Sequence, residues 1–121
     1  MITEDYVSYE VAKLLKEKGF DEPCQKCYYV STKSIEDVHN GRNTILSSFF
    51  ISCPTLQMAT KWLRETHGID IIIEISDPSV KDRKYYCIIW DGNNNSYILD
   101  LFNSYEEACE AAIEYVLENL I

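Results

Sequence analysis

The segment Lys84-Tyr-Tyr-Cys-Ile-Ile-Trp-Asp91 determines how the rest of the chain is arranged. It is rich in β-branched and aromatic residues, which are typical of β-strands. Successive side chains of a strand point to opposite faces of a sheet, and the two sets here are Tyr85, Cys87 and Ile89, and Tyr86, Ile88 and Trp90. Because both sets are apolar, we expect a central strand that is covered on both sides.

Two neighbouring segments have the pattern of partner strands. Residues 92–95, Gly-Asn-Asn-Asn, favour a turn because glycine and asparagine tolerate a positive φ angle. The chain then returns through 96–102, where the two faces are Tyr97, Leu99 and Leu101, and Ser96, Ile98, Asp100 and Phe102. Isoleucines at every second position over 69–75 predict a half-buried strand before the central one. Together these segments predict an antiparallel meander.

Three helices are expected from apolar spacing and capping residues. Ser8 is a candidate N-cap of the first helix and Gly19 its stop, while Pro54 suits the first turn of the second helix. Ser104 and Glu107 fit a capping box at the start of the last helix. The expected helical ranges are 8–18, 54–67 and 104–121.

Region 24–53 has weaker patterns. Segments 27–31 and 44–52 are strand candidates that would pair, Asn40-Gly41 is typical of a turn, and 34–39 has the composition of one helical turn. The whole pattern predicts an α+β fold in which an antiparallel meander sheet of three to five strands packs with three helices. The length of 121 residues predicts a single domain, 1–121, that buries about two thirds of its extended-chain surface.

Composition limits the classes of function. The net charge is −9, and Lys84 is the last basic residue, so the surface repels phosphate backbones and direct nucleic-acid binding is disfavoured. The chain shows neither a signal peptide nor the apolar run of about 20 residues that a membrane span needs. Five scattered cysteines favour a reducing compartment over a disulfide framework. We therefore expect a cytoplasmic protein without membrane contact.

Three segments resemble the recurring blocks of a known family. They are Ser8-Tyr-Glu-Val-Ala-Lys-Leu-Leu-Lys-Glu-Lys-Gly-Phe-Asp-Glu-Pro23, Pro54-Thr-Leu-Gln-Met-Ala-Thr-Lys-Trp-Leu-Arg-Glu65 and Ser104-Tyr-Glu-Glu-Ala-Cys-Glu-Ala-Ala-Ile-Glu-Tyr-Val-Leu-Glu-Asn-Leu-Ile121. The family comprises small uncharacterised proteins of gut anaerobes, their mobile elements and their phages. The resemblance covers the three expected helices, somewhat over a third of the chain. It implies an accessory protein of a genetic element and brings no assigned activity, cofactor or site residue.

Cys24-Gln-Lys-Cys27 is the motif with metal or redox potential. Two thiolates at this spacing can bind one zinc ion, and His39 or Cys53 would complete a tetrahedral set. The motif lacks the glycine that usually follows a zinc-knuckle cysteine, and it lacks the strand-to-helix context of a thioredoxin-like site. Incidental reduced cysteines are the favoured interpretation, and a small zinc- or redox-active protein is an alternative.

The last helix carries a ladder of like charges. Glu106, Glu110, Glu114 and Glu118 recur every four residues. Each such pair of like charges costs about 0.2–0.5 kcal/mol of helix stability. A solvated face of an acidic protein is the favoured interpretation. The functional alternative is a docking stripe for a basic partner, in its extreme form a mimic of DNA phosphates.

An aromatic platform is expected on the second face of the meander, formed by Tyr86, Trp90, Phe102 and Ile72. Aromatic sheets stack unpaired bases in proteins that bind single-stranded RNA, but those sites need a basic rim, which this hairpin lacks. The favoured interpretation is therefore that the platform is covered by N-terminal segments of the chain or by a second copy of it.

No recognisable catalytic or cofactor motif is present, whether of the Walker, Rossmann, nucleophile-elbow or zincin type. We expect a non-enzymatic, small acidic accessory or adaptor protein that uses no cofactor and binds protein partners or itself. Self-association is the leading hypothesis for the partner. An acidic, DNA-mimicking inhibitor of a host nucleic-acid enzyme is the main alternative. An enzyme whose site is assembled only in three dimensions is a further one.

Overall fold

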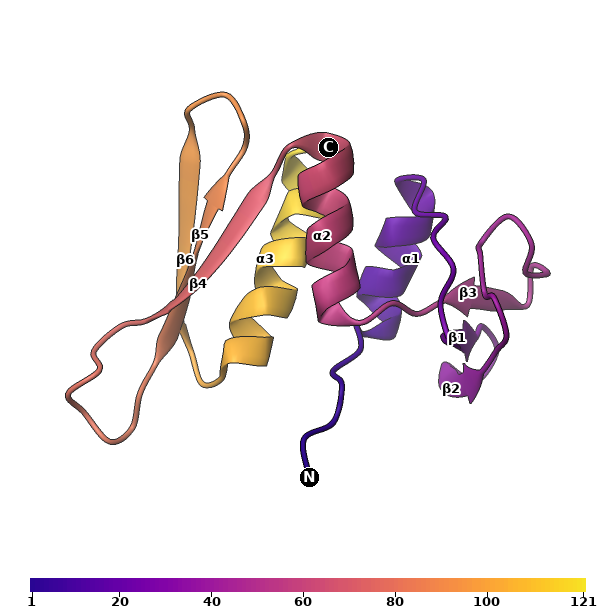
Figure 1. Ribbon diagram of the computed structural model, residues 1–121, viewed down its shortest axis with the longest axis horizontal. Coiled ribbons are helices and arrows are strands. Elements are labelled where there is room, and N and C mark those ends of the chain that lie inside the picture. The colour runs from indigo at the N-terminus through magenta and orange to yellow at the C-terminus, as the bar shows by residue number, and fades with distance from the viewer. The chain divides into compact units, whose positions relative to one another are not determined.

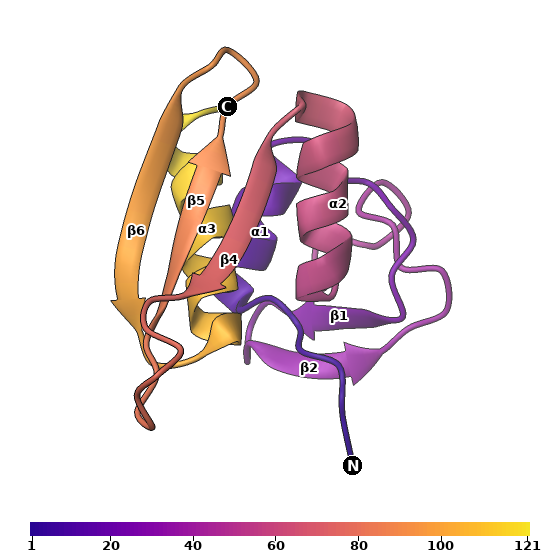
Figure 2. The same ribbon diagram turned by 60° about the vertical axis from the view of Figure 1, so that its left-hand side comes forward.

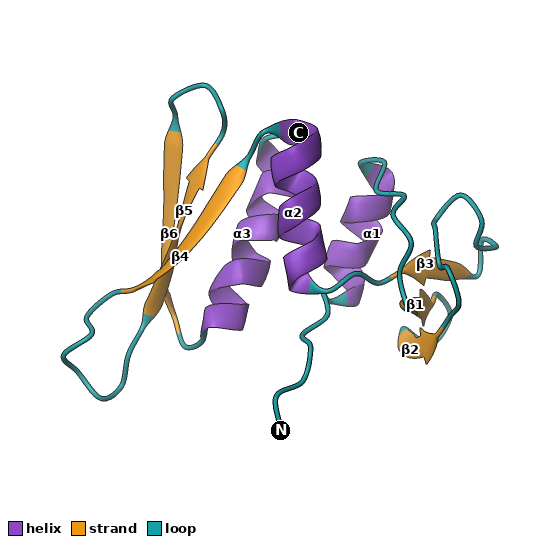
Figure 3. Cartoon of the chain, in the orientation of Figure 1, coloured by secondary structure: helices purple, strands orange, loops and turns teal.

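The computed structural model describes residues 1–121 and confirms the α+β fold class, with three helices and two three-stranded antiparallel sheets (Figures 1 and 3). In chain order the elements are α1 (Tyr9–Glu17), β1 (Lys26–Tyr29), β2 (Ser34–Asp37), β3 (Phe50–Ser52), α2 (Leu56–His67), β4 (Asp70–Ile75), β5 (Tyr85–Trp90), β6 (Ser96–Phe102) and α3 (Tyr105–Asn119). The chain divides into two compact units, residues 1–59 and 60–121, each with its own sheet. The expected single domain, 1–121, stays a prediction.

The unit formed by residues 60–121 is built on the predicted meander. β5 lies between β4 and β6, and both neighbours run antiparallel to it. α3 packs against one face of all three strands (Figure 2). Cys87 and Ile89 point to that face and are fully buried. The prediction that residues 84–91 form the central strand is therefore confirmed. The expectation that both faces of this strand are covered is wrong, because Trp90 on the opposite face is 43% exposed.

A β-bulge in β6 reverses the predicted orientation of the last two side chains of this strand. Leu99 is opposite Cys87 and Phe102 is opposite Tyr85, so β6 has one more residue than β5 between these two pairs. Leu101 occupies the extra position with a φ of 66°, and its side chain is 69% exposed. Phe102 thereby joins the face of Tyr85, on which α3 packs. The expectation that Phe102 belongs to the outer platform is wrong, because strict alternation does not hold through a bulge.

At the start of α3 the predicted N-cap is present, whereas the reciprocal hydrogen bond of the capping box is shifted by one residue, from Ser104 to Asn103. The Ser104 hydroxyl accepts a hydrogen bond from the N–H of Glu107 at 3.1 Å. The Glu107 carboxylate in turn accepts one from the N–H of Asn103 at 3.1 Å. The buried residues of the helix are Ala108, Cys109, Ala112, Ile113, Val116 and Leu117. Small residues in this set let the helix approach the strands closely.

α2 ends before Gly68 as predicted, but it begins later than expected. The Thr55 hydroxyl accepts a hydrogen bond from the N–H of Met58 at 3.1 Å, so Thr55 acts as the capping residue and the helix begins at Leu56. The placement of Pro54 in the first turn is therefore wrong. The Pro54 carbonyl instead accepts a hydrogen bond from the N–H of Val7 at 3.1 Å, which fastens the N-terminal segment to this connection.

The unit formed by residues 1–59 contains α1 and a sheet in the order β2-β1-β3. Ser8 caps α1 as predicted, because its hydroxyl accepts a hydrogen bond from the N–H of Val11 at 3.3 Å. Tyr28 of β1 joins the helix to the sheet. Its ring meets the ring of Tyr9 edge-on at 5.6 Å, and its hydroxyl donates to the carbonyl of Val7 at 2.6 Å.

The small sheet corrects two expectations for region 24–53. Segments 27–31 and 44–52 do supply a pair of strands, but the second strand is only β3, and residues 44–49 form turns. The hydroxyl and N–H of Thr44 donate to the carboxylate of Asp21. The predicted helical turn at 34–39 is wrong. Residues Ser34–Asp37 are β2, which pairs along the whole of β1.

Candidate functional site

The face of the meander that points away from α3, called the outer face here, is apolar in the middle and acidic at its corners. The strand register places its side chains in three rows across the sheet. The rows are Asp70, Trp90 and Ser96; then Ile72, Ile88 and Ile98; then Glu74 and Tyr86, with Asp100 beyond Ile98 on β6. The apolar residues therefore form a cross, with the isoleucine row as one arm and the middle of β5 as the other.

The apolar residues of the outer face are open to solvent. Ile98 is 63% exposed, Trp90 43% and Ile72 41%. Ile88, at the centre of the cross, and Tyr86, at the end of one arm, are half-buried. Figure 1 shows α3 on one side of the three strands and no element of the same unit on the other side. Contiguous exposed apolar side chains are typical of surfaces at which proteins interact.

The charged groups of the outer face are carboxylates. Asp70, Glu74 and Asp100 are exposed and occupy three of its four corners, and none of its side chains is basic. The Tyr86 hydroxyl donates a hydrogen bond to the Glu74 carboxylate at 2.6 Å, and this bond raises the pKa of Tyr86. Tyr86 thus keeps a polar tip at the edge of the cross. The negative corners make the face a poor surface for nucleic acid.

The glutamate ladder of α3 is a separate surface. Glu106, Glu114 and Glu118 are exposed and Glu110 is half-buried. Two of them, Glu114 and Glu118, border a shallow hollow of about 260 Å³ beside Tyr115. Because α3 packs on the inner face of the meander, the structure does not join the ladder to Tyr86 and Trp90. The docking stripe on α3 stays a prediction, and binding at the outer face does not depend on it.

The two cysteines of the CxxC motif are buried thiols. Cys24 precedes β1 and its Sγ lies 3.5 Å from the carbonyl oxygen of Glu22, to which it donates, while Cys27 lies within β1. Burial raises the pKa of Cys24 to about 11 and also raises the pKa of Cys27. No three His, Cys, Asp or Glu side chains of the chain are grouped so as to hold a metal ion. His39 and Cys53 therefore do not complete a zinc site around the motif.

We expect the native thiols to resist modification at pH 8. All five cysteines are free and buried, and burial raises the pKa of both Cys24 and Cys109 to about 11, so neither forms the reactive thiolate at this pH. A chromogenic disulfide reagent should modify fewer than about one thiol per native chain within minutes, and all five after unfolding. Fast modification of native Cys24 would revive the redox hypothesis.

The same pKa shifts predict a loss of stability in alkali. The folded-state pKa of Cys24 and Cys109 lies above the ordinary value of 9.0, so the folded chain holds these protons more tightly than the unfolded chain does. The stabilising contribution is complete below about pH 9 and is lost as the pH rises toward about 11. Urea unfolding at pH 7, 9 and 10.5 measures this loss, and replacement of Cys109 by alanine should reduce it.

Sequence reasoning found part of the outer face and missed the rest. Tyr86 and Trp90 were expected there, and so was Ile72, whereas the row that joins Ile72 to Ile98 was not recognised. The alternation of each strand contained the signal, but only the register shows that isoleucines from three strands stand side by side. The acidic corners were missed for the same reason.

Comparison with known proteins supplies no functional assignment. No protein-family model, no curated protein and no solved structure matches the chain. None of its helices has both the length and the apolar character that crossing a bilayer requires. The resemblance to small proteins of gut anaerobes and their phages stays a prediction carried by three helical segments.

Proposed function

We propose that this chain is a non-enzymatic accessory or adaptor protein that binds a protein partner through the outer face of its meander. The single observation that supports the proposal is the exposed apolar cross centred on Ile88, with carboxylates at its corners. Removing apolar surface from water is favourable by about 25 cal/mol per Å², and the entropic cost of association opposes this gain. An isoleucine row that stays open in the isolated chain is therefore available for binding.

Charge selects the class of partner. The corner carboxylates Asp70, Glu74 and Asp100 attract lysine and arginine side chains at the rim of a partner surface. A protein segment with an apolar ridge between basic residues, such as an amphipathic helix, matches both the centre and the corners. Nucleic acid offers no apolar ridge and is repelled by the same carboxylates.

Self-association is the second arrangement to consider. A twofold dimer brings the same patch of both copies together, so the acidic corners of one outer face would lie near those of the other. The chain already carries a net charge of −9. Charge therefore opposes this dimer at neutral pH, and we expect a monomer by light scattering at about 200 μM, a concentration at which a standard interface would be occupied.

The compartment and the biological setting belong to the same proposal. Five free, buried thiols suit a reducing compartment, so we place the protein in the cytoplasm. The resemblance of its helices to proteins of phages and mobile elements supports a role as an accessory protein of a genetic element. No cofactor is needed for such a role.

The experiment uses a photo-reactive amino acid at position 98 or at position 45. Ile98 lies on the outer face and Ile45 lies in a turn of the other unit, and both side chains are 63% exposed. In host lysate we expect specific cross-links from position 98 only. In a pull-down without the photo-reactive amino acid, we also expect Ile98→Asp to reduce recovery of the partner identified by cross-linking by about tenfold, equivalent to about 1.4 kcal/mol. Ile45→Asp should leave that recovery unchanged.

Two results would contradict the proposal. One is the absence of any partner linked through position 98, and the other is an equal loss of partner in Ile98→Asp and Ile45→Asp. Competition by duplex DNA distinguishes the proposal from the inhibitor alternative. A phosphate mimic occupies the DNA-binding site of its partner, so DNA would displace it, whereas DNA should not displace a partner held by apolar contacts at Ile98.

A further inference from the structure

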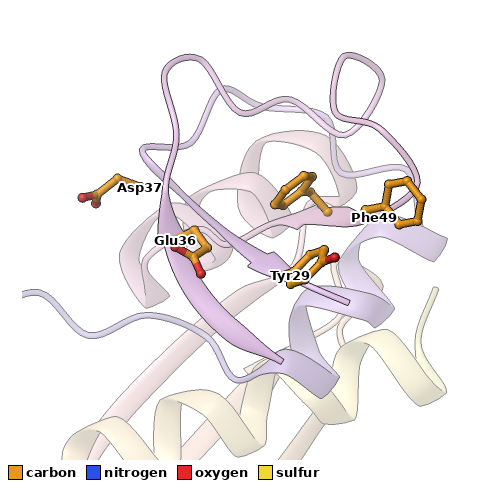
Figure 4. A pocket seen from close by; sticks show the side chains of 5 residues that line it. Tyr29, Glu36, Asp37 and Phe49 are labelled. Carbon is orange, nitrogen blue, oxygen red and sulfur yellow. The ribbon is translucent and has the colours of Figure 1, made fainter. Parts of the chain in front are cut away.

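The unit formed by residues 1–59 contains a hollow, called the aromatic hollow here, that is independent of the outer face. Its lining residues are Tyr29, Glu36, Asp37, Phe49 and Phe50 (Figure 4). The hollow has a volume of about 440 Å³ and opens to solvent. It combines aromatic rings with carboxylates, and it contains no basic side chain.

The small sheet positions the rings. Tyr29 is opposite Phe50 across the β1–β3 pair, and their ring centroids are 5.3 Å apart with the planes tilted by 33°. Phe49 precedes β3, and its carbonyl accepts a hydrogen bond from the N–H of Val30 at 2.8 Å. Its side chain is 63% exposed. A phenylalanine that open, beside two further rings, provides aromatic surface for a ligand.

The two carboxylates differ in how their charge is balanced. Asp37 is opposite Lys26 and forms an ion pair with it, and Figure 4 shows the Asp37 side chain turned away from the rings. Glu36 is opposite Cys27, so it shares the face of Tyr29. It accepts a hydrogen bond from the hydroxyl of Ser34 at 3.2 Å and forms no ion pair. Glu36 therefore presents an unbalanced negative charge beside the rings.

We propose that the aromatic hollow binds an arginine side chain of a partner protein. A guanidinium ion is planar and weakly hydrated, stacks on aromatic faces, and donates two parallel hydrogen bonds to a carboxylate. Phe49 and Phe50 supply the faces and Glu36 supplies the carboxylate. A lysine ammonium ion is more strongly hydrated and lacks the planar shape. Anionic ligands are repelled by Glu36.

The test is an NMR titration of the full chain with three amino-acid amides. The probes are N-acetyl-arginine amide, N-acetyl-lysine amide and N-acetyl-citrulline amide, the last being an uncharged analogue of arginine. We expect saturable binding of the arginine probe with a Kd of about 1–10 mM, as suits a single side chain in an open site. The lysine probe should bind about threefold more weakly and the citrulline probe about tenfold more weakly. Shifts should centre on Tyr29, Glu36 and Phe49.

Matched variants locate the site. Glu36→Gln and Phe49→Ala should each weaken arginine binding by about fivefold or more. The controls are Glu4→Gln, which removes the same charge from an exposed position, and Ile45→Ala, which truncates an equally exposed side chain of the same connection. Both controls should bind as the parent chain does. Since all four side chains are exposed, the variants should keep the parent spectrum elsewhere.

Three results would overturn the assignment. They are equal affinity for the arginine and citrulline probes, unchanged affinity in Glu36→Gln, and shifts spread over acidic residues throughout the chain, as expected for a loosely held counter-ion. Because none of these readouts involves Ile98, the aromatic hollow and the outer face succeed or fail separately.

Discussion

Replacement of Ile89 by alanine is expected to lower the free energy of unfolding by about 2–5 kcal/mol. Ile89 is fully buried on the side of β5 that packs against α3. The truncation removes apolar burial and leaves a cavity that the strands and helix close only in part. Urea unfolding followed by circular dichroism measures the change through the shift in midpoint.

Ile98→Ala is the matched control for this prediction. Ile98 belongs to the same sheet and loses the same atoms, but it lies on the outer face and is 63% exposed. Its replacement should change the free energy of unfolding by less than about 1 kcal/mol. Equal losses in the two variants would contradict the assignment of inner and outer faces, and with it the proposed docking surface.

Gly92→Ala is the second change with a large expected effect, about 2–4 kcal/mol of destabilisation. Gly92 starts the turn between β5 and β6 with a φ of +86°. An alanine there is strained by its backbone angle, and its Cβ would also lie 2.9 Å from the carbonyl oxygen of Gly68. A backbone oxygen cannot move aside as a flexible side chain does, so the turn must shift.

Gly68→Ala separates the two causes. Gly68 has a φ of +67°, but a Cβ built on it meets no atom within 4 Å. Its replacement should therefore cost only the backbone strain, about 1–2 kcal/mol. The difference in unfolding free energy between the two variants measures the cost of the steric clash between a Cβ at position 92 and the Gly68 carbonyl oxygen. If both lose the same stability, this close approach does not occur in solution.

The parts of the fold that sequence predicted are those with dense local signals. Alternating isoleucines and aromatic residues identified the meander, and Ser8 and Ser104 identified the starts of α1 and α3 through hydrogen bonds that span only three residues. These signals need no knowledge of distant partners. The central position of β5 was also predictable, because three strand-like segments in succession favour a meander with the second one in the middle. The two apolar faces of β5 predicted cover on both sides, which the outer face lacks.

The parts that sequence did not predict depend on pairing between strands. β2 has the sequence Ser-Ile-Glu-Asp and is exposed at all four positions. Its sequence therefore shows no alternation of apolar and polar residues that would predict a half-buried strand. The bulge has leucine, not glycine, at the position with the positive φ angle, so the sequence did not indicate it. The aromatic hollow combines Tyr29, Glu36 and Phe50 from three strands. Only the register brings these residues together, and register is decided by tertiary packing.

The bulge at Leu101 has a consequence for solubility. β6 is an edge strand, and the unpaired N–H and C=O groups of an edge can recruit a strand from another molecule. Edge strands with exposed apolar side chains, such as Ile98 and Leu101 of β6, favour that kind of pairing. The positive φ of Leu101 breaks the even spacing of those groups, so an incoming strand loses its alignment there. The kink that moves Phe102 inward therefore interrupts one edge of the sheet, along which a foreign strand could otherwise pair.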